Sequence, residues 1–287
     1  MISLLLFFFL LLSYIITLLI LPFLLQMLRR AGVVRPNYKD EHIPVGAGLV
    51  FFVSLILSSI VLMFFSLTSA LNLLTLLFVV LTMTLLGIID DLLGSGDTRG
   101  LKGHFKKLII EKELTTGAFK ALIGGMVGLL ISLTLLTPEL SVSFLLMALL
   151  YTLIIALTTN FINLLDLRPG RAGKGFILIA LLLIIIGFKS EQITLLGLIL
   201  GSILAYIPKD LKAEAMMGDA GSNVLGVTLG LFSLWVLSLP YQIGLLVILI
   251  VLHIITEKYS LTRIIKKNKF LNYLDMLGRA RNGSSDN

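Results

Sequence analysis

The sequence predicts an all-α polytopic integral membrane protein of about nine transmembrane helices, with its N-terminus outside and its C-terminal tail in the cytoplasm. Composition is the first reason, because 57% of the residues are hydrophobic, 14% are charged and the mean hydropathy is +1.05. Such values are typical of a membrane bundle rather than of a soluble core. Apolar segments recur along the chain, and on the arrangement described below only Lys189 of the 23 lysines and arginines lies outside. That asymmetry is what the positive-inside rule describes.

Each predicted helix is an apolar run of roughly the 20 residues that a spanning helix needs. The first run, Ile2–Met27, is followed by Arg29 and Arg30 and has no positive N-terminal region or small-residue cleavage site. It is therefore expected to be a transmembrane helix and not a signal peptide. The nine segments are about 2–28, 45–67, 71–89, 117–136, 143–162, 173–188, 192–207, 221–238 and 241–257.

Residues 1–257 thus form a transmembrane domain, and residues 258–287 form a basic cytoplasmic tail. Part of this tail is expected to be an amphipathic helix on the membrane surface. The net charge of +7 is explained by basic cytoplasmic loops and does not call for nucleic acid as a partner. The absence of cysteine excludes disulfides and thiolate metal sites.

Three polar groups, far apart in the sequence, fall at the cytoplasmic ends of predicted helices. Polar residues that share one membrane face in this way are typical of a single site built between helices. The groups are Asp90 with Asp91 after segment 71–89, Asn160 with Asn163 and Asp166 around the end of segment 143–162, and Asp219 before segment 221–238.

The residue types in these groups favour a hard divalent cation. Asn160, Asn163 and Asp166 are spaced by three residues, so that their side chains can share one helix face. Amide and carboxylate oxygens suit Mg²⁺, with Mn²⁺ as an alternative, and nothing in the pattern suits zinc.

Phosphate recognition is indicated by a glycine-flanked acid and by basic loops. Gly218 and Gly221 surround Asp219 at a predicted helix start, where Ser222 or Asn223 is expected to cap the helix and free N–H groups can bind phosphate. The basic candidates for binding phosphates or anionic lipid headgroups are Lys39, Arg99, Lys102, Lys106, Lys107, Arg168, Arg171 and Lys174.

Each of these features also has a purely structural interpretation. Asp90 and Asp91 can be a solvated helix end, Asn160 and Asn163 can link helices by hydrogen bonds, and loop cations can simply set topology. The structural interpretation must hold independently at three places on one face, and that coincidence favours a functional site.

Together, the polar groups form motifs that resemble those of the polyprenyl-phosphate N-acetylhexosamine-1-phosphate transferases of glycosyl transferase family 4. The matching stretches are IIDDLLG, NFINLLD against the family's N-x-x-N-x-x-D, and MMGDAGSN against its M-G-D-x-G-S. Weaker agreement comes from IPVGAGLVF and from Glu257-x-x-Ser260. The order of the motifs holds from about residue 30 to residue 265.

The resemblance implies an enzyme of the inner cell membrane with its active site at the cytoplasmic face. Such enzymes use Mg²⁺ to transfer a sugar-1-phosphate from a UDP-sugar to a polyprenyl phosphate, which releases UMP and starts cell-wall or surface glycans. By motif, Asp219 and Asn163 are the metal ligands, and Asp90 and Asp91 are the catalytic acids. The substrate-binding residues are then Asn160, Asp166, Arg168, Arg171, Lys39 and Ser222.

Two departures from the family keep alternatives open. DLRPGRAGKG replaces the usual D-G-x-D-G-L run, and the histidine-rich loop after segment 241–257 is missing, with Arg263, Lys266 and Lys267 in the tail instead. A family member with a different donor is one alternative.

An ion-coupled transporter is another alternative, although its acids would be expected near the bilayer midplane. A prenyltransferase would need D-x-x-x-D pairs, which the chain lacks. A homodimer is left open.

Overall fold

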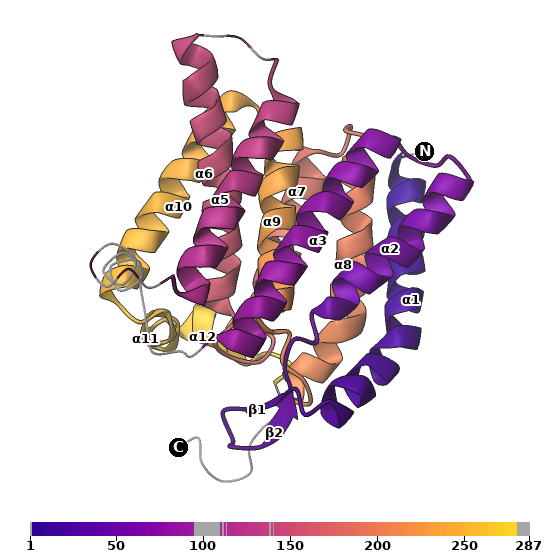
Figure 1. Ribbon diagram of the computed structural model, residues 1–287, viewed down its shortest axis with the longest axis vertical. Helices are drawn as coiled ribbons and strands as arrows, with labels where there is room; N and C mark the ends of the chain where they lie inside the picture. The colour runs from indigo at the N-terminus through magenta and orange to yellow at the C-terminus, as the bar shows by residue number, and fades with distance from the viewer. Residues whose placement is uncertain are drawn as a thin grey trace.

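A computed structural model describes residues 2–94, 110, 112, 114–137, 139 and 141–279, and within these ranges the chain is a bundle of helices (Figure 1). A long helix lies at each of the nine predicted segments. These helices are α1 (Ile2–Arg30), α2 (Leu49–Phe64), α3 (Ala70–Leu93), α5 (Thr116–Leu135), α6 (Val142–Leu165), α7 (Arg171–Ile186), α8 (Ile193–Leu211), α9 (Gly218–Val236) and α10 (Leu239–Lys258). Two short helices, α11 (Leu261–Lys267) and α12 (Lys269–Met276), form the described part of the tail.

Six of these helices are long and apolar enough to cross a membrane, namely α1, α3, α5, α6, α8 and α10. The helices α2 and α7 have 16 residues each, and with α9 they fall outside this set. The outer helices expose large apolar side chains, among them Phe7, Phe23 and Ile248. Such surfaces suit contact with lipid. The length and apolar composition of these helices indicate a membrane protein.

A small β-hairpin between α1 and α2 was not predicted. Strand β1 (Val34–Pro36) pairs antiparallel with β2 (His42–Pro44). The side chain of Asn37 closes the hairpin, because its Oδ1 accepts hydrogen bonds from the backbone nitrogens of Lys39 and Glu41. Strands of three residues leave too short an alternating pattern to be seen in a sequence. The hairpin, α11 and α12 lie at one end of the bundle, opposite the N-terminus (Figure 1).

Helix α9 is at the centre of the bundle and is buried along nearly its whole length. It packs on α3 and α6 and also touches α2, α7 and α8. Small residues allow this close packing: a Cβ on Gly226 would lie 2.4 Å from the Cα of Thr159, and one on Gly87 would lie 2.3 Å from the nitrogen of Ala220. Without a hydrophobic driving force between helices in lipid, close backbone contact of this kind is a main source of packing energy.

Gly87→Ala is therefore expected to push α3 away from α9 and to lower stability by about 1–3 kcal/mol, the usual cost of overpacking. The apparent melting temperature in detergent measures the effect. The matched control is Gly125→Ala in α5, where an added Cβ would meet nothing within 4 Å. Equal melting temperatures for the two variants would contradict the close α3–α9 packing.

Candidate functional site

Polar side chains from four helices meet at the end of the bundle that carries the hairpin and the tail. They come from the end of α3, the first two turns of α5 and of α9, and the last turn of α6. The structure thus brings together Asp90, Asp91, Asn163, Asp219 and Ser222, which lie up to 132 positions apart in the sequence. Convergence of these predicted residues is what a site between helices requires.

Lys120 of α5 lies between two of the acids. Its Nζ is 2.7 Å from Oδ2 of Asp90 and also donates a hydrogen bond to Oδ2 of Asp219. The three side chains are each about one-fifth exposed, so that water still reaches them. One ammonium group therefore balances part of the charge of two carboxylates that face each other.

Asn163 and Ser222 extend this cluster on the α6 side. The Nδ2 of Asn163 donates to Oδ2 of Asp219 at 3.3 Å, and its Oδ1 accepts from Oγ of Ser222 at 3.2 Å. The hydroxyl of Ser222 thus fixes the orientation of the amide that contacts Asp219. This arrangement corrects the expected cap role of Ser222 and Asn223, because α9 begins at Gly218 and both residues lie inside it.

Asp91 has a different environment from its neighbour Asp90. Its carboxylate accepts hydrogen bonds from the backbone nitrogens of Asp219 at 2.9 Å and Ala220 at 3.1 Å. A carboxylate at a helix N-terminus satisfies free N–H groups and interacts favourably with the helix dipole. The N–H groups that were expected to bind phosphate are therefore bonded to Asp91 in this structure. Asp91 joins the end of α3 to the start of α9.

Backbone contacts with the N-terminal part of the chain also fix the start of α9. The nitrogen of Met216 donates to the oxygen of Pro44, and the nitrogens of Ala47 and Gly48 donate to the oxygens of Met216 and Met217 at 3.0 Å each. A Cβ on Gly48 would lie only 2.1 Å from the Cα of Gly221. Residues 44–48 and 216–217 thus form one backbone unit beside the cluster.

The loop that follows α6 carries two further predicted residues. Asp166 ends α6, and its burial raises its pKa well above the ordinary range, with the carboxylates of Asp210 and Asp219 raising it further. The guanidinium carbon of Arg168 is 5.6 Å from the centre of the Tyr38 ring in the hairpin, a cation–π distance. Nζ of Lys39 lies 5.6 Å from the centre of the same ring.

Other predicted residues lie apart from the cluster. Asn160 is exposed on α6. Arg171 is buried and bonded to Asp275 and Thr262 of the tail, and Lys174 donates to backbone oxygens of the tail. The predicted phosphate contacts Arg99, Lys102, Lys106 and Lys107 lie outside the described residues.

Lys120 is the site residue that the sequence reasoning missed. It lies near the start of the predicted segment 117–136, and it was considered only as one of the lysines and arginines that are not outside. The available clue was its isolation, because the described part of α5 has no other charged residue. A charged residue inside a membrane helix is costly and is by default a functional candidate.

The cluster contains donors that fit a magnesium ion. Asp90, Asp219 and Asn163 offer hard carboxylate and amide oxygens, and the position between the two acids already accommodates the cationic group of Lys120. Within the described ranges, no three His, Cys, Asp or Glu side chains gather as a metal site of their own. The side chains therefore fit an ion that is coordinated by one or two carboxylates and whose other ligands are substrate phosphates and water. This coordination is usual for Mg²⁺.

The structure is thus a membrane bundle with two acids, an amide and a lysine gathered at one end. The family model of glycosyl transferase family 4 matches residues 73–237, which is more than half of the chain and runs from α3 to α9. The chain belongs to glycosyl transferase family 4, and it is a transferase. No curated protein matches it.

Proposed function

We propose that the protein transfers a sugar-1-phosphate, in particular N-acetylhexosamine-1-phosphate, from a UDP-sugar to a polyprenyl phosphate. A phosphate oxygen of the lipid forms a bond to the β-phosphorus of the donor, and the bond from that phosphorus to the bridging oxygen breaks. UMP leaves and a polyprenyl-diphospho-sugar remains. The single observation that carries the proposal is the convergence of Asp90, Lys120, Asn163 and Asp219 in a member of this family.

The acids and the amide have separate tasks in this proposal. Asp219 and Asn163 would hold Mg²⁺, and the carboxylate of Asp90 would lie beside them. When bound, the metal ion supplies charge neutralisation at the diphosphate. Asp91 keeps the first turn of α9 in place through its two backbone hydrogen bonds. A lipid monophosphate is already largely ionised at neutral pH, so that its attack needs orientation more than a base.

Lys120 is proposed as the phosphate contact that the motifs do not include. Its ammonium lies at the two acids, and a small movement of its long side chain would bring it to a bound phosphate. Positioned cations that meet developing charge are commonly the largest contribution to such a reaction. Asp166, Asn160, Arg168, Lys39 and Ser222 are proposed on the donor side of the site, with Arg171 supporting the loop that carries Arg168.

The proposed topology has nine spans, with the N-terminus outside and the cluster at the cytoplasmic face of the inner membrane. The distribution of lysine and arginine supports it, since only Lys189 then lies outside. Residues 1–257 are the transmembrane catalytic domain and residues 258–287 the cytoplasmic tail. The lipid product would serve cell-wall or surface-glycan synthesis, and the partners would be the lipid, the nucleotide sugar and the membrane.

The test uses the purified full-length protein with undecaprenyl phosphate, Mg²⁺ and a panel of UDP-sugars, with GDP- and CDP-sugars as alternative donors. We expect a lipid-linked sugar diphosphate and one equivalent of UMP with one donor of the panel, and no product in the presence of EDTA. Nucleotide release that EDTA does not stop, or no lipid product with any donor, would overturn the proposal.

A further inference from the structure

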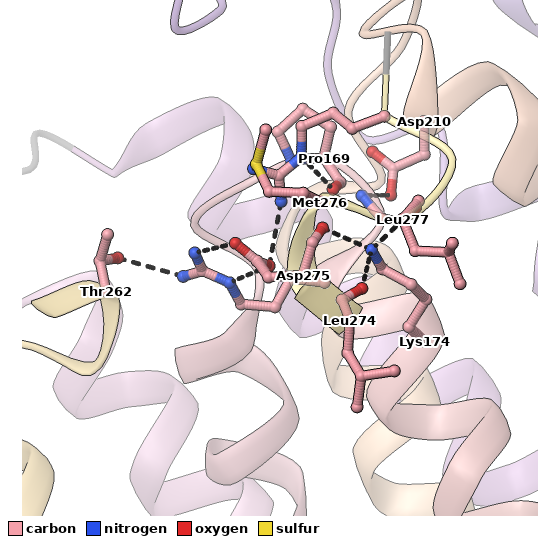
Figure 2. A network of polar contacts seen from close by, with 11 residues as sticks. Pro169, Lys174, Asp210, Thr262, Leu274, Asp275, Met276 and Leu277 are labelled. Carbon is pink, nitrogen blue, oxygen red and sulfur yellow. Dashed lines mark hydrogen bonds and ion pairs between the residues drawn. The ribbon is translucent and has the colours of Figure 1, made fainter. Parts of the chain in front are cut away.

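A polar network around the buried pair Arg171 and Asp275 connects the described part of the tail to the start of α7 (Figure 2). The tail network consists of Arg171, Lys174, Asp275 and Arg279. Two hydrogen bonds join Arg171 to Asp275, from Nε to Oδ1 at 2.8 Å and from Nη2 to Oδ2 at 3.0 Å. Its Nη1 also donates to Oγ1 of Thr262 at 3.1 Å, so that one guanidinium binds both α11 and α12.

Lys174 binds the end of α12 in the same network. Its Nζ donates to the backbone oxygens of Leu274, Asp275 and Leu277, at 2.8, 2.5 and 3.2 Å (Figure 2). Leu274 and Asp275 lie in the last turn of α12 and Leu277 directly follows it, so that these carbonyl groups have no partner within the helix. A cation at this position also interacts favourably with the helix dipole. The tail is therefore held by contacts specific to the end of α12 and not merely by apolar packing.

The network reaches the loop that precedes α7. Nη2 of Arg279 is bonded to Asp275 at 3.0 Å, and its Nε donates to the backbone oxygen of Pro169 at 3.2 Å. The next residue, Gly170, has a φ of +74° and donates its N–H to Asp210 of α8 at 2.9 Å. Contacts from the tail and from α8 thus fix two consecutive residues of a five-residue loop, 166–170.

This loop presents residues that the proposed function places at the donor. It starts at Asp166, three residues after Asn163, and it carries Arg168 against the ring of Tyr38. Arg168 is partly accessible and Tyr38 is 37% exposed, so that both remain available to a ligand. The conformation of the loop between Asn163 and α7 therefore decides where the Arg168 guanidinium lies.

The carboxylate of Asp275 is the shared element of the tail network, since Arg171 and Arg279 both bind it. Burial alone would raise the pKa of Asp275, but the hydrogen bonds and charge of Arg171 outweigh this effect and hold the pKa below its usual value. Asp275 is therefore ionised at neutral pH. Removal of its charge would leave two buried guanidinium groups without their counter-ion, which is far more disruptive than loss of an exposed pair.

We propose that Asp275 is a positioning residue for nucleotide-sugar binding, which acts by tying the tail to the loop 166–170 and so placing Arg168. The proposal rests on the transferase function proposed above. It assigns the tail a role in donor affinity that the motifs of α3, α6 and α9 do not provide. A supporting shell of this kind commonly decides whether a binding side chain is held in its productive geometry.

The test is Asp275→Asn in the full chain, which keeps the size of the side chain and removes its charge. The Michaelis constant for the nucleotide sugar is expected to rise about tenfold or more, while kcat and the Michaelis constant for the lipid change less than about twofold. Amide hydrogen exchange of residues 166–174 is expected to become about tenfold faster. Asp275→Glu should recover part of the donor affinity, because it restores the charge.

Glu191→Gln is the matched control, since it also removes one negative charge but from an exposed position between α7 and α8. It should leave both exchange and kinetics unchanged. Unchanged amide exchange of residues 166–174 in Asp275→Asn would overturn the proposal. A roughly tenfold fall in kcat with an unchanged Michaelis constant for the nucleotide sugar would overturn it too. If the wild type makes no lipid product but amide exchange is still faster in Asp275→Asn, the proposed function is wrong. The structural contact between the tail and the loop 166–170 is then still supported.

Discussion

Asp219→Ala is expected to abolish transfer while the protein still inserts and folds. Asp219 combines contacts from Lys120 and Asn163 with a place in the first turn of α9, and the proposed function makes it a ligand of the metal ion. Loss of a metal ligand or of a comparable electrostatic contact commonly costs on the order of 10³-fold in rate. Product formation with saturating donor, lipid and Mg²⁺ is the measurement.

Asp219→Asn sharpens the experiment because it keeps the size and hydrogen-bonding capacity of the side chain. Activity should still fall by about the same factor, since an amide lacks the charge that holds a divalent ion. The control is Glu139→Gln, an exposed acid between α5 and α6. Asp219→Asn and Glu139→Gln should each elute as a single species in size-exclusion chromatography in detergent. Wild-type activity in either Asp219 variant would remove Asp219 from the proposed metal site.

The second large effect is expected for Lys120→Met. Methionine preserves the length and apolar stem of the side chain but leaves Asp90 and Asp219 without the ammonium that they share. If Lys120 also contacts the substrate phosphate, activity should fall by about 10²- to 10³-fold. The Mg²⁺ concentration that gives half of the remaining activity should fall too, because the ammonium and a divalent ion compete for the same two carboxylates.

Lys189→Met is the control for this variant, because Lys189 is an exposed lysine in the connection between α7 and α8. Activity of Lys120→Met within about threefold of the wild type would reduce Lys120 to a structural counter-charge. A higher Mg²⁺ requirement, with lost activity, would instead mean that the ammonium maintains the geometry of the acids and does not compete with the metal ion.

Much of the fold could be predicted from the sequence because spanning segments leave a strong local signal. Each of the nine apolar runs corresponds to a long helix in the described part of the chain, and six of these helices are long and apolar enough to cross a membrane. The membership in the transferase family, inferred from three motifs, is confirmed. The hairpin β1–β2 was missed because its strands are too short to show a period.

The site was predicted less completely, because the sequence identifies acids but not their partners. Asp90, Asn163 and Asp219 do meet, as expected. The different environments of Asp90 and Asp91 could not be predicted, since they depend on where α5 and α9 pack. The partner of Arg171 lies 104 positions further along the chain, and no local pattern links the two. Long-range polar pairing of this kind is a property of tertiary structure.

The backbone unit of residues 44–48 and 216–217 has a consequence for how the catalytic part of this chain can be delimited. The family match starts at residue 73. The backbone hydrogen bonds that hold the residues before α9, however, come from residues 44–48, which precede the matched span. A fragment cut to the matched span would lose the partners of the backbone groups of Met216 and Met217, which lie next to Asp219, the acid proposed to hold the metal ion. A working fragment of this protein is therefore expected to need residues 44–48 as well as the matched span.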